Sequence, residues 1–196
     1  FPCTTMRSVL QYKKILYAAR GMPGGLKVMR VRILGVDPGL ATVGYGVIEA
    51  GRGKLSPVDY GVIETPAHVP LPRRLFLVYK GMKDLIDAFS PHAIAFEELF
   101  FYHNVNTALP VGHARGVLLL AAEEAGLPMY EFTPMQIKQA TVGYGHAEKK
   151  QVQEMVRLRL GLKSVPKPDD AADALAVAIC CAGAWGPMID EEYGIK

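Results

Sequence analysis

The stretch that most constrains the fold is residues 31–48, where two apolar runs flank the turn Asp37-Pro38-Gly39. Apolar runs of this length predict buried strands, and a Pro-Gly pair ends a strand abruptly. Asp37 is therefore expected where a buried strand reaches the surface. A carboxylate held there loses hydration, and the free energy that this costs must be offset by a nearby cation. The alternative is an Asp that caps the turn, and this stretch alone leaves both interpretations open.

The rest of the chain predicts an α/β domain. The first three strands, joined by short turns, predict an antiparallel meander. Strand–helix–strand order further along predicts parallel pairing with a right-handed crossover. Pro110 is expected in the first turn of its helix, where proline is tolerated. The predicted strands cover 31–36, 43–49, 55–64, 93–96 and 128–132, and the predicted helices cover 71–89, 107–125, 147–160 and 169–183.

Composition bounds the class of protein. Half of the 196 residues are hydrophobic, enough for the core of one domain, and no apolar run reaches membrane-spanning length. Three cysteines form no disulfide framework and indicate a reducing cytosol. Residues 1–28 contain basic side chains and no acid, so we expect a disordered leader or a misassigned start, with a presequence as the alternative. The domain is expected at 29–184, followed by a flexible tail at 185–196.

The net charge of +3 hides an uneven distribution. Residues 1–36 hold seven Lys and Arg and no acid, which leaves 15 basic and 19 acidic residues in 37–196, a net of −4. A nucleic-acid partner must therefore be argued from local clusters. One cluster carries a net +4 against Glu148 and Glu154 and suits phosphate contacts, although a solvated helix face is the alternative. Its basic members are Lys138, Lys149, Lys150, Arg157, Arg159 and Lys163.

Carboxylates recur at predicted buried positions, where a negative charge costs free energy. Glu97 ends the strand predicted at 93–96, much as Asp37 ends the first strand. Asp170 and Asp173 share a face of the last helix, and the surroundings of Asp173 are small and apolar. No Lys or Arg lies close to these acids in sequence. Oxygen ligands of this kind predict Mg²⁺ or Mn²⁺, and two such ions about 3.5–4 Å apart support phosphodiester cleavage. Unconnected structural acids are the competing interpretation.

Five motifs in order give the chain a resemblance to a known family. They are GVDPG at 35–39, FEELFF at 96–101, GHARGV at 112–117, QIKQATVGYGHAEKKQV at 136–152 and DDAADALAVAI at 169–179. Together they closely resemble RuvC, the bacterial Holliday junction resolvases. The resemblance implies a ribonuclease H-like fold with a five-stranded mixed sheet, three strands antiparallel and two parallel, flanked by helices. It also implies homodimers that nick two strands of like polarity in a four-way DNA junction, with two Mg²⁺ per active site and Mn²⁺ as a substitute.

The resemblance assigns roles to individual residues. The metal-binding catalytic acids correspond to Asp37, Glu97, Asp170 and Asp173, while Glu98 and Asp169 are close decoys. Phe100 stands where the family has an aromatic that stacks on junction bases, and Phe101 and Tyr102 are alternatives to it. Apart from the resemblance, aromatics in such a loop more often anchor a core. Lys138 and Lys149 match lysines near the DNA backbone, and Lys150 belongs to the same cluster. Arg115 is expected to orient phosphate or to stabilise the dimer.

The resemblance also implies partners and a location. We expect four-way junction DNA, a second copy of the chain and the RuvA–RuvB branch-migration complex as partners, in the bacterial cytoplasm at the nucleoid and without a membrane. Actin-like and sugar-kinase ATPases share the superfamily, but 196 residues leave no room for their second nucleotide-binding half. A junction-binding protein without catalysis is disfavoured because all four acids are present. A related nuclease of ribosomal RNA processing lacks this aromatic and lysine pattern.

Overall fold

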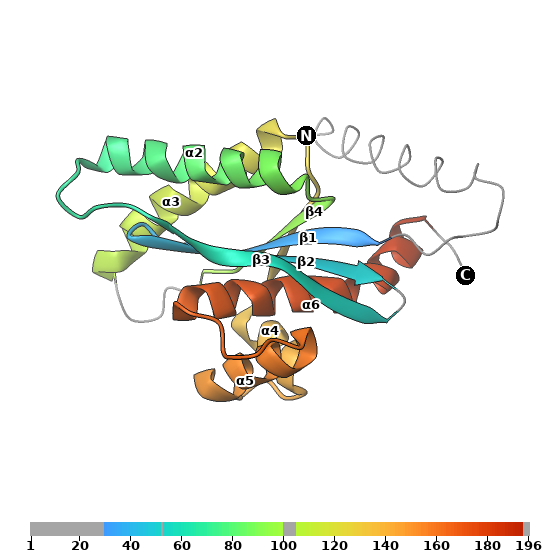
Figure 1. The fold of residues 1–196 in the computed structure, drawn as a ribbon. Coiled ribbons are helices and arrows are strands. Elements are labelled where there is room, and N and C mark those ends of the chain that lie inside the picture. The colour runs from blue at the N-terminus through green and yellow to red at the C-terminus, as the bar shows by residue number, and fades with distance from the viewer. Residues whose placement is uncertain (1–29, 52, 100–104, 194–196) are drawn as a thin grey trace.

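The computed structural model of the chain describes residues 30–51, 53–99 and 105–193, and it has three layers (Figure 1). A central sheet is covered on one face by helices α2 and α3 and on the other by α6, with α4 and α5 packed beyond α6 (Figure 1). The predicted leader 1–28 and the aromatic residues Phe100 and Phe101 lie outside the described residues. No helix in the described part of the chain is long and apolar enough to cross a membrane.

The sheet has five strands in the order β3-β2-β1-β4-β5. β1 pairs antiparallel with β2, and β2 pairs antiparallel with β3, as the short turns predicted. β4 pairs parallel with both β1 and β5. The predicted mixed sheet of three antiparallel and two parallel strands is therefore confirmed. The strands are β1 (Val31–Asp37), β2 (Thr42–Gly51), β3 (Lys54–Glu64), β4 (Ala93–Glu97) and β5 (Met129–Phe132).

Five helices are described, one more than the sequence predicted. The additional helix, α4, has only nine residues, too few for a clear apolar period. Its start nevertheless carries a local signal, since Thr133 and Gln136 form a reciprocal capping box around Pro134. The helices are α2 (Leu71–Phe89), α3 (Val105–Glu124), α4 (Pro134–Val142), α5 (Lys149–Leu160) and α6 (Asp169–Tyr193).

Two expectations about helix boundaries are wrong. Pro110 lies inside α3 rather than in its first turn, because the helix already begins at Val105. Only the first four N–H groups of a helix lack an intrahelical acceptor. Pro110 is the sixth residue of α3, so it removes one intrahelical hydrogen bond. α6 continues to Tyr193 instead of ending near residue 183, so much of the segment 185–196 is helical. The flexibility of that segment stays a prediction.

Glycines let α6 lie directly on the sheet. A Cβ atom on Gly35 of β1 would be 2.2 Å from the carbonyl oxygen of Ala174, and one on Gly44 of β2 would be 2.1 Å from that of Asp170. Both distances are far below van der Waals contact, so only glycine fits at this helix spacing. The first half of α6 is correspondingly buried all round, as its apolar sequence predicted. The sheet thus has one apolar core against α6 and a second one against α2 and α3.

We expect Gly35→Ala to lower the free energy of unfolding by ~1–3 kcal/mol or more, because the new methyl group overpacks a backbone contact. The matched control is Gly183→Ala in α6, where a Cβ would meet nothing within 4 Å. That substitution should be neutral or raise stability by up to about 1 kcal/mol through helix propensity. Urea denaturation of both variants measures the difference. Equal stability of the two variants would show that α6 does not need the glycine contact.

Candidate active site

Two of the predicted acids meet at one edge of the sheet. Asp37 is the last residue of β1 and Glu97 the last residue of β4. The two strands are parallel neighbours in the register Val36–Phe96, so the acids that follow these residues lie side by side at the carboxyl edge. The fold therefore brings together residues that are 60 positions apart in the chain.

The start of α6 brings the other two acids to the same edge. Gly44 is the register partner of Asp37 across β1 and β2, and the backbone of Asp170 packs directly against Gly44. Asp173 follows on the same helical face, three residues later. The glycine contact thus fixes how far along the sheet α6 begins. All four predicted acids consequently occupy one site, although they come from three separate elements.

The charges in this site repel one another. Burial, together with the carboxylates of Glu97, Asp173 and Asp170, raises the pKa of Asp37 from 3.8 to about 8. Burial is also the main cause of the raised pKa of Glu97, to which Asp173 adds. The pKa of Asp173 is raised by burial as well, against an opposing contribution from Lys149. Such a concentration of buried, mutually repelling acids needs cations for compensation.

The fold supplies one cation that the local sequence around the acids does not show. Lys149, the first residue of α5, places its Nζ atom 2.8 Å from Oδ2 of Asp173 and 3.8 Å from Oδ2 of Asp169. The pair with Asp173 raises the pKa of the lysine. The inference that no basic residue lies near the acids is therefore wrong, because Lys149 pairs with Asp173, and Lys167, three residues before Asp170, pairs with Asp169. The approach of α5 to α6 places an ammonium group inside the carboxylate site.

The donor set fits a hard divalent cation in chemistry, charge and burial. Four carboxylates offer only oxygen ligands, the kind that Mg²⁺ and Mn²⁺ prefer. In residues 30–51, 53–99 and 105–193, however, no three Asp, Glu, His or Cys side chains converge closely enough to share one ion. Lys149 holds the carboxylate of Asp173 in this arrangement. The acids nevertheless share burial and mutual repulsion, which a divalent cation would relieve.

The decoy acid Asp169 has different surroundings. Its carboxylate accepts a hydrogen bond of 2.6 Å from the ammonium group of Lys167, which lowers the pKa of Asp169. Its side chain is 45% exposed, against 25% for Asp173. Asp169 is thus more exposed than Asp173 and pairs with a lysine two residues away in the chain, while the choice of Asp170 and Asp173 as metal ligands stays a prediction.

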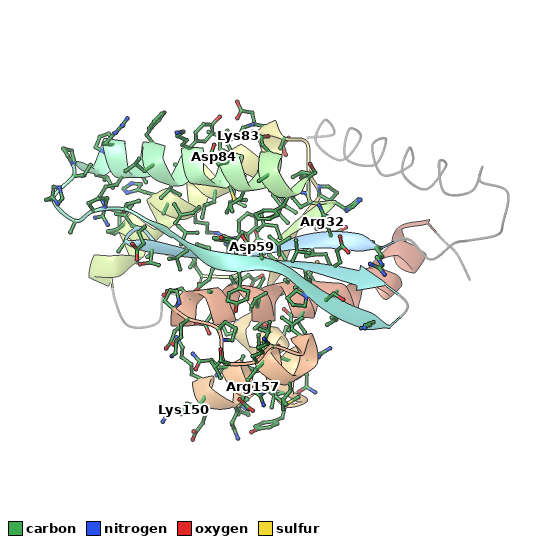
Figure 2. All side chains as sticks on the ribbon, in the orientation of Figure 1. Arg32, Asp59, Lys83, Asp84, Lys150 and Arg157 are labelled. Atoms are coloured by element: carbon green, nitrogen blue, oxygen red, sulfur yellow. The ribbon has the colours of Figure 1, made fainter. Side chains whose placement is uncertain are left out.

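The predicted DNA contacts fall into three groups. Lys138 on α4 is close enough to lower the pKa of Glu97, and Lys149 contacts the acids directly. Lys150 is exposed on α5, in the outer helical layer that also carries Arg157 (Figure 2). Phe100 and Phe101 lie outside the described residues, so their role stays a prediction.

Arg115 is directed inward. One guanidinium nitrogen donates a hydrogen bond of 3.0 Å to the carbonyl oxygen of Glu97, and the other lies 2.7 Å from Oε2 of Glu131. Its side chain is only 15% exposed. No local sequence signal indicates this contact, because Glu131 lies on β5, 16 residues after Arg115 in the chain. Because the guanidinium group already contacts two acceptors within the protein, the structure does not favour the predicted contact of Arg115 with a DNA phosphate.

Comparison with solved structures places this site in a known fold. Thermus thermophilus RuvC superimposes with a TM-score of 0.75 at 39% identity, over 81% of this chain and 97% of that one. A second structure, T. thermophilus RuvC in complex with Holliday junction substrate, gives a TM-score of 0.74 at 36% identity over 80% and 96% of the two chains. The predicted ribonuclease H-like fold is therefore confirmed.

Comparison of sequences agrees with the comparison of structures. The family model for crossover junction endodeoxyribonuclease RuvC matches residues 33–181, which include all four acids. The crossover junction endodeoxyribonuclease RuvC of Desulfitobacterium hafniense is 57% identical over 150 residues, which are 76% of this chain and 91% of that protein. Identity at this level over nearly the whole length of a relative reflects common ancestry. The chain belongs to the RuvC family.

Proposed function

We propose that the chain is a structure-selective endonuclease that resolves four-way DNA junctions in recombination and repair. The observation that carries the proposal is the meeting of Asp37, Glu97, Asp170 and Asp173 at one edge of the sheet. Relatives that are more than half identical bear the name crossover junction endodeoxyribonuclease, and a structural neighbour is described in complex with a Holliday junction substrate. Together these features support DNA phosphodiester hydrolysis as the reaction.

The four acids would hold two Mg²⁺ ions, with Mn²⁺ as a substitute. When bound, such a pair of ions activates the attacking water and stabilises the leaving oxygen of the phosphodiester. The residues of the chain contribute position and electrostatics. Asp37 and Glu97 are buried at the ends of two strands, and their raised pKa values reflect the cost of negative charge there, which a bound cation would offset. Lys149 would leave Asp173 and turn to a DNA phosphate.

The basic residues around the site would bind the DNA backbone. Lys138 and Lys149 lie beside the acids, and Lys150 extends the positive surface outward along α5. Contacts of this kind position a duplex without reading its sequence. Recognition of the junction itself then depends on its shape and on the aromatic residues Phe100 and Phe101, which stay candidates for base stacking.

Paired symmetric nicks in strands of like polarity require two active sites, so the proposal includes a homodimer. The exposed face of α3 suits a second copy of the helix. Leu109 and Leu120 are 66% and 60% exposed, and Gly116 between them has nothing within 4 Å of a Cβ position. Large apolar side chains flanking an open glycine allow close helix packing. Sedimentation at micromolar concentration should give a dimer, and a monomer both with and without junction DNA would contradict this part of the proposal.

Further partners follow from membership of the family. The RuvA–RuvB branch-migration complex would deliver the junction to the dimer, and the reaction would take place at the bacterial nucleoid in the cytoplasm. A pull-down of RuvA–RuvB on a junction, with and without the chain, tests the first part. If the chain is retained only on junction DNA that carries no RuvA–RuvB, the partnership with that complex is contradicted.

The central experiment is incubation of the protein with a synthetic four-way junction and Mg²⁺ beside a linear duplex of the same sequence. We expect paired nicks in the junction and little cleavage of the duplex. Tight junction binding without cleavage would favour the alternative function, a binding protein that has lost catalysis. Equal cleavage of both substrates would indicate a nuclease without selectivity for structure.

Asp37→Asn separates a catalytic acid from a structural one. The substitution is nearly isosteric and removes one charge from a repelling cluster, so the melting temperature without metal should be unchanged or higher. Junction binding with the metal chelated should hold or improve, since one charge that opposes phosphate is gone. Cleavage in Mg²⁺ should fall by more than the ~10–100-fold that the loss of an outer-shell partner costs. A variant that melts much lower and binds poorly would make Asp37 structural.

Lys149→Met and Lys150→Met form a matched pair. Each removes one phosphate contact, so each should weaken binding of junction and duplex and reduce the slope of log affinity against log salt by about 1. Only Lys149 is paired with Asp173, so only its loss should also lower the stability of the protein without metal, by up to ~1 kcal/mol. Gel shifts at several salt concentrations and melting curves measure both effects. Identical melting curves for the two variants would argue against a stabilising role for the ion pair of Lys149 and Asp173.

A further inference from the structure

Arg115 connects the ends of two neighbouring strands through one guanidinium group. Its Nη1 atom donates to the carbonyl oxygen of Glu97 at 3.0 Å, and its Nη2 atom lies 2.7 Å from Oε2 of Glu131. The first contact is with the end of β4 and the second is with β5. A residue of α3 thereby holds the edge of the sheet at which the proposed active site lies.

Arg115 reaches Glu97 from the face opposite to the acids. Phe96 belongs to the core between the sheet and helices α2 and α3, and Glu131 is its register partner on β5. The guanidinium carbon of Arg115 lies 6.0 Å from the centre of the Phe96 ring, on this same face. Side chains alternate along a strand, so Glu97 points to the other face, toward Asp173 of α6. Arg115 thus holds the backbone of Glu97 and leaves its carboxylate free.

The backbone of Glu97 needs such a partner. The pairing of β1 with β4 ends at Val36 and Phe96, one residue before Glu97. On the β5 side the ladder continues, since the N–H of Glu98 donates to the carbonyl oxygen of Phe132 at 2.9 Å. The carbonyl group of Glu97 therefore lies beyond the last register pair of β1 and β4, at the point where the chain leaves the sheet. The bond from Arg115 restrains the remaining freedom of this strand end.

We propose that Arg115 is a positioning residue that fixes the main chain of Glu97, so that its carboxylate is placed for the divalent cation. The inference rests on the proposed function of the four acids and assigns Arg115 a role other than DNA contact. A guanidinium group is suited to the task because its planar fork presents several N–H donors at once. A lysine keeps the charge but has a single nitrogen, which cannot bridge a carbonyl and a carboxylate across this distance.

The test compares Arg115→Lys with a matched variant at the opposite end of the sheet. Arg32 near the start of β1 (Figure 2) makes the same pair of contacts, from Nη1 to the carbonyl oxygen of Phe89 at 2.6 Å and from Nη2 to Oε1 of Glu49 at 2.7 Å. Arg32→Lys therefore removes an equivalent bridge far from the acids. Any general loss of stability should appear in both variants, whereas an effect on Glu97 should appear only in Arg115→Lys.

Three measurements on the full chain separate the possible roles. Binding of Mn²⁺ alone, followed by electron paramagnetic resonance, should weaken ~10–100-fold in Arg115→Lys and stay unchanged in Arg32→Lys. Single-turnover junction cleavage should fall by a similar factor at limiting Mn²⁺ and recover in part at high Mn²⁺. Junction affinity with the metal chelated, and its salt slope, should be those of the unaltered chain, because no phosphate contact has been removed.

The outcomes are distinct. Wild-type Mn²⁺ affinity in Arg115→Lys, or an equal loss in Arg32→Lys, overturns the positioning role. A reduced salt slope would make Arg115 a DNA contact instead. Should Arg115→Lys fail to fold, Glu131→Gln keeps an oxygen acceptor and loses only the charge, and a change in its Mn²⁺ affinity is again required. If the unaltered chain binds Mn²⁺ but does not cleave a junction, the proposed function fails while the role of Arg115 is still tested.

Discussion

Helix α6 packs directly against the glycines of β1 and β2. Gly35 and Gly44 have the helix backbone where a side chain would begin, so the helix lies against the strands at the smallest possible spacing. This contact buries the apolar half of α6 and also sets its position along the sheet. Because Gly44 is the register partner of Asp37, the position of the helix decides that Asp170 and Asp173 face Asp37 and Glu97. The packing of α6 on the sheet therefore also sets the geometry of the carboxylate site.

That geometry has an electrostatic cost. Asp37, Glu97 and Asp173 have raised pKa values, with burial as the first cause and neighbouring carboxylates adding to it in each. A sheet built for stability alone would place apolar residues at these strand ends. Retention of the acids is understandable if the site binds cations, and Lys149 supplies a protein cation at the same place. If these acids bind metal as we propose, the site exchanges some stability for that function.

The layers on the two faces of the sheet serve the site in different ways. On the α6 face, α4 and α5 bring Lys138 and Lys149 beside the acids and extend a basic surface away from them. On the opposite face, Arg115 of α3 holds the end of β4 through the carbonyl group of Glu97. The same helix exposes Leu109 and Leu120 on its outer side, where a second copy would pack. Separate elements thus hold the strand end that carries Glu97, supply the basic side chains beside the acids, and offer the proposed dimer contact.

The order of the strands and most of the helices, and the mixed pairing of the sheet, could be predicted from the sequence, because apolar period and turn residues are local properties. The four acids were selected through the resemblance to RuvC, and their role as metal ligands stays a prediction. The sequence also carried the capping box that begins α4 at Thr133, although nine residues gave too weak a period for that helix to be recognised. The long-range partners of the charged residues follow instead from tertiary packing. The contacts from Lys149 to Asp173 and from Arg115 to Glu131 join elements whose spacing is set by packing. No local pattern encodes such contacts, since they depend on how closely the helices approach the sheet.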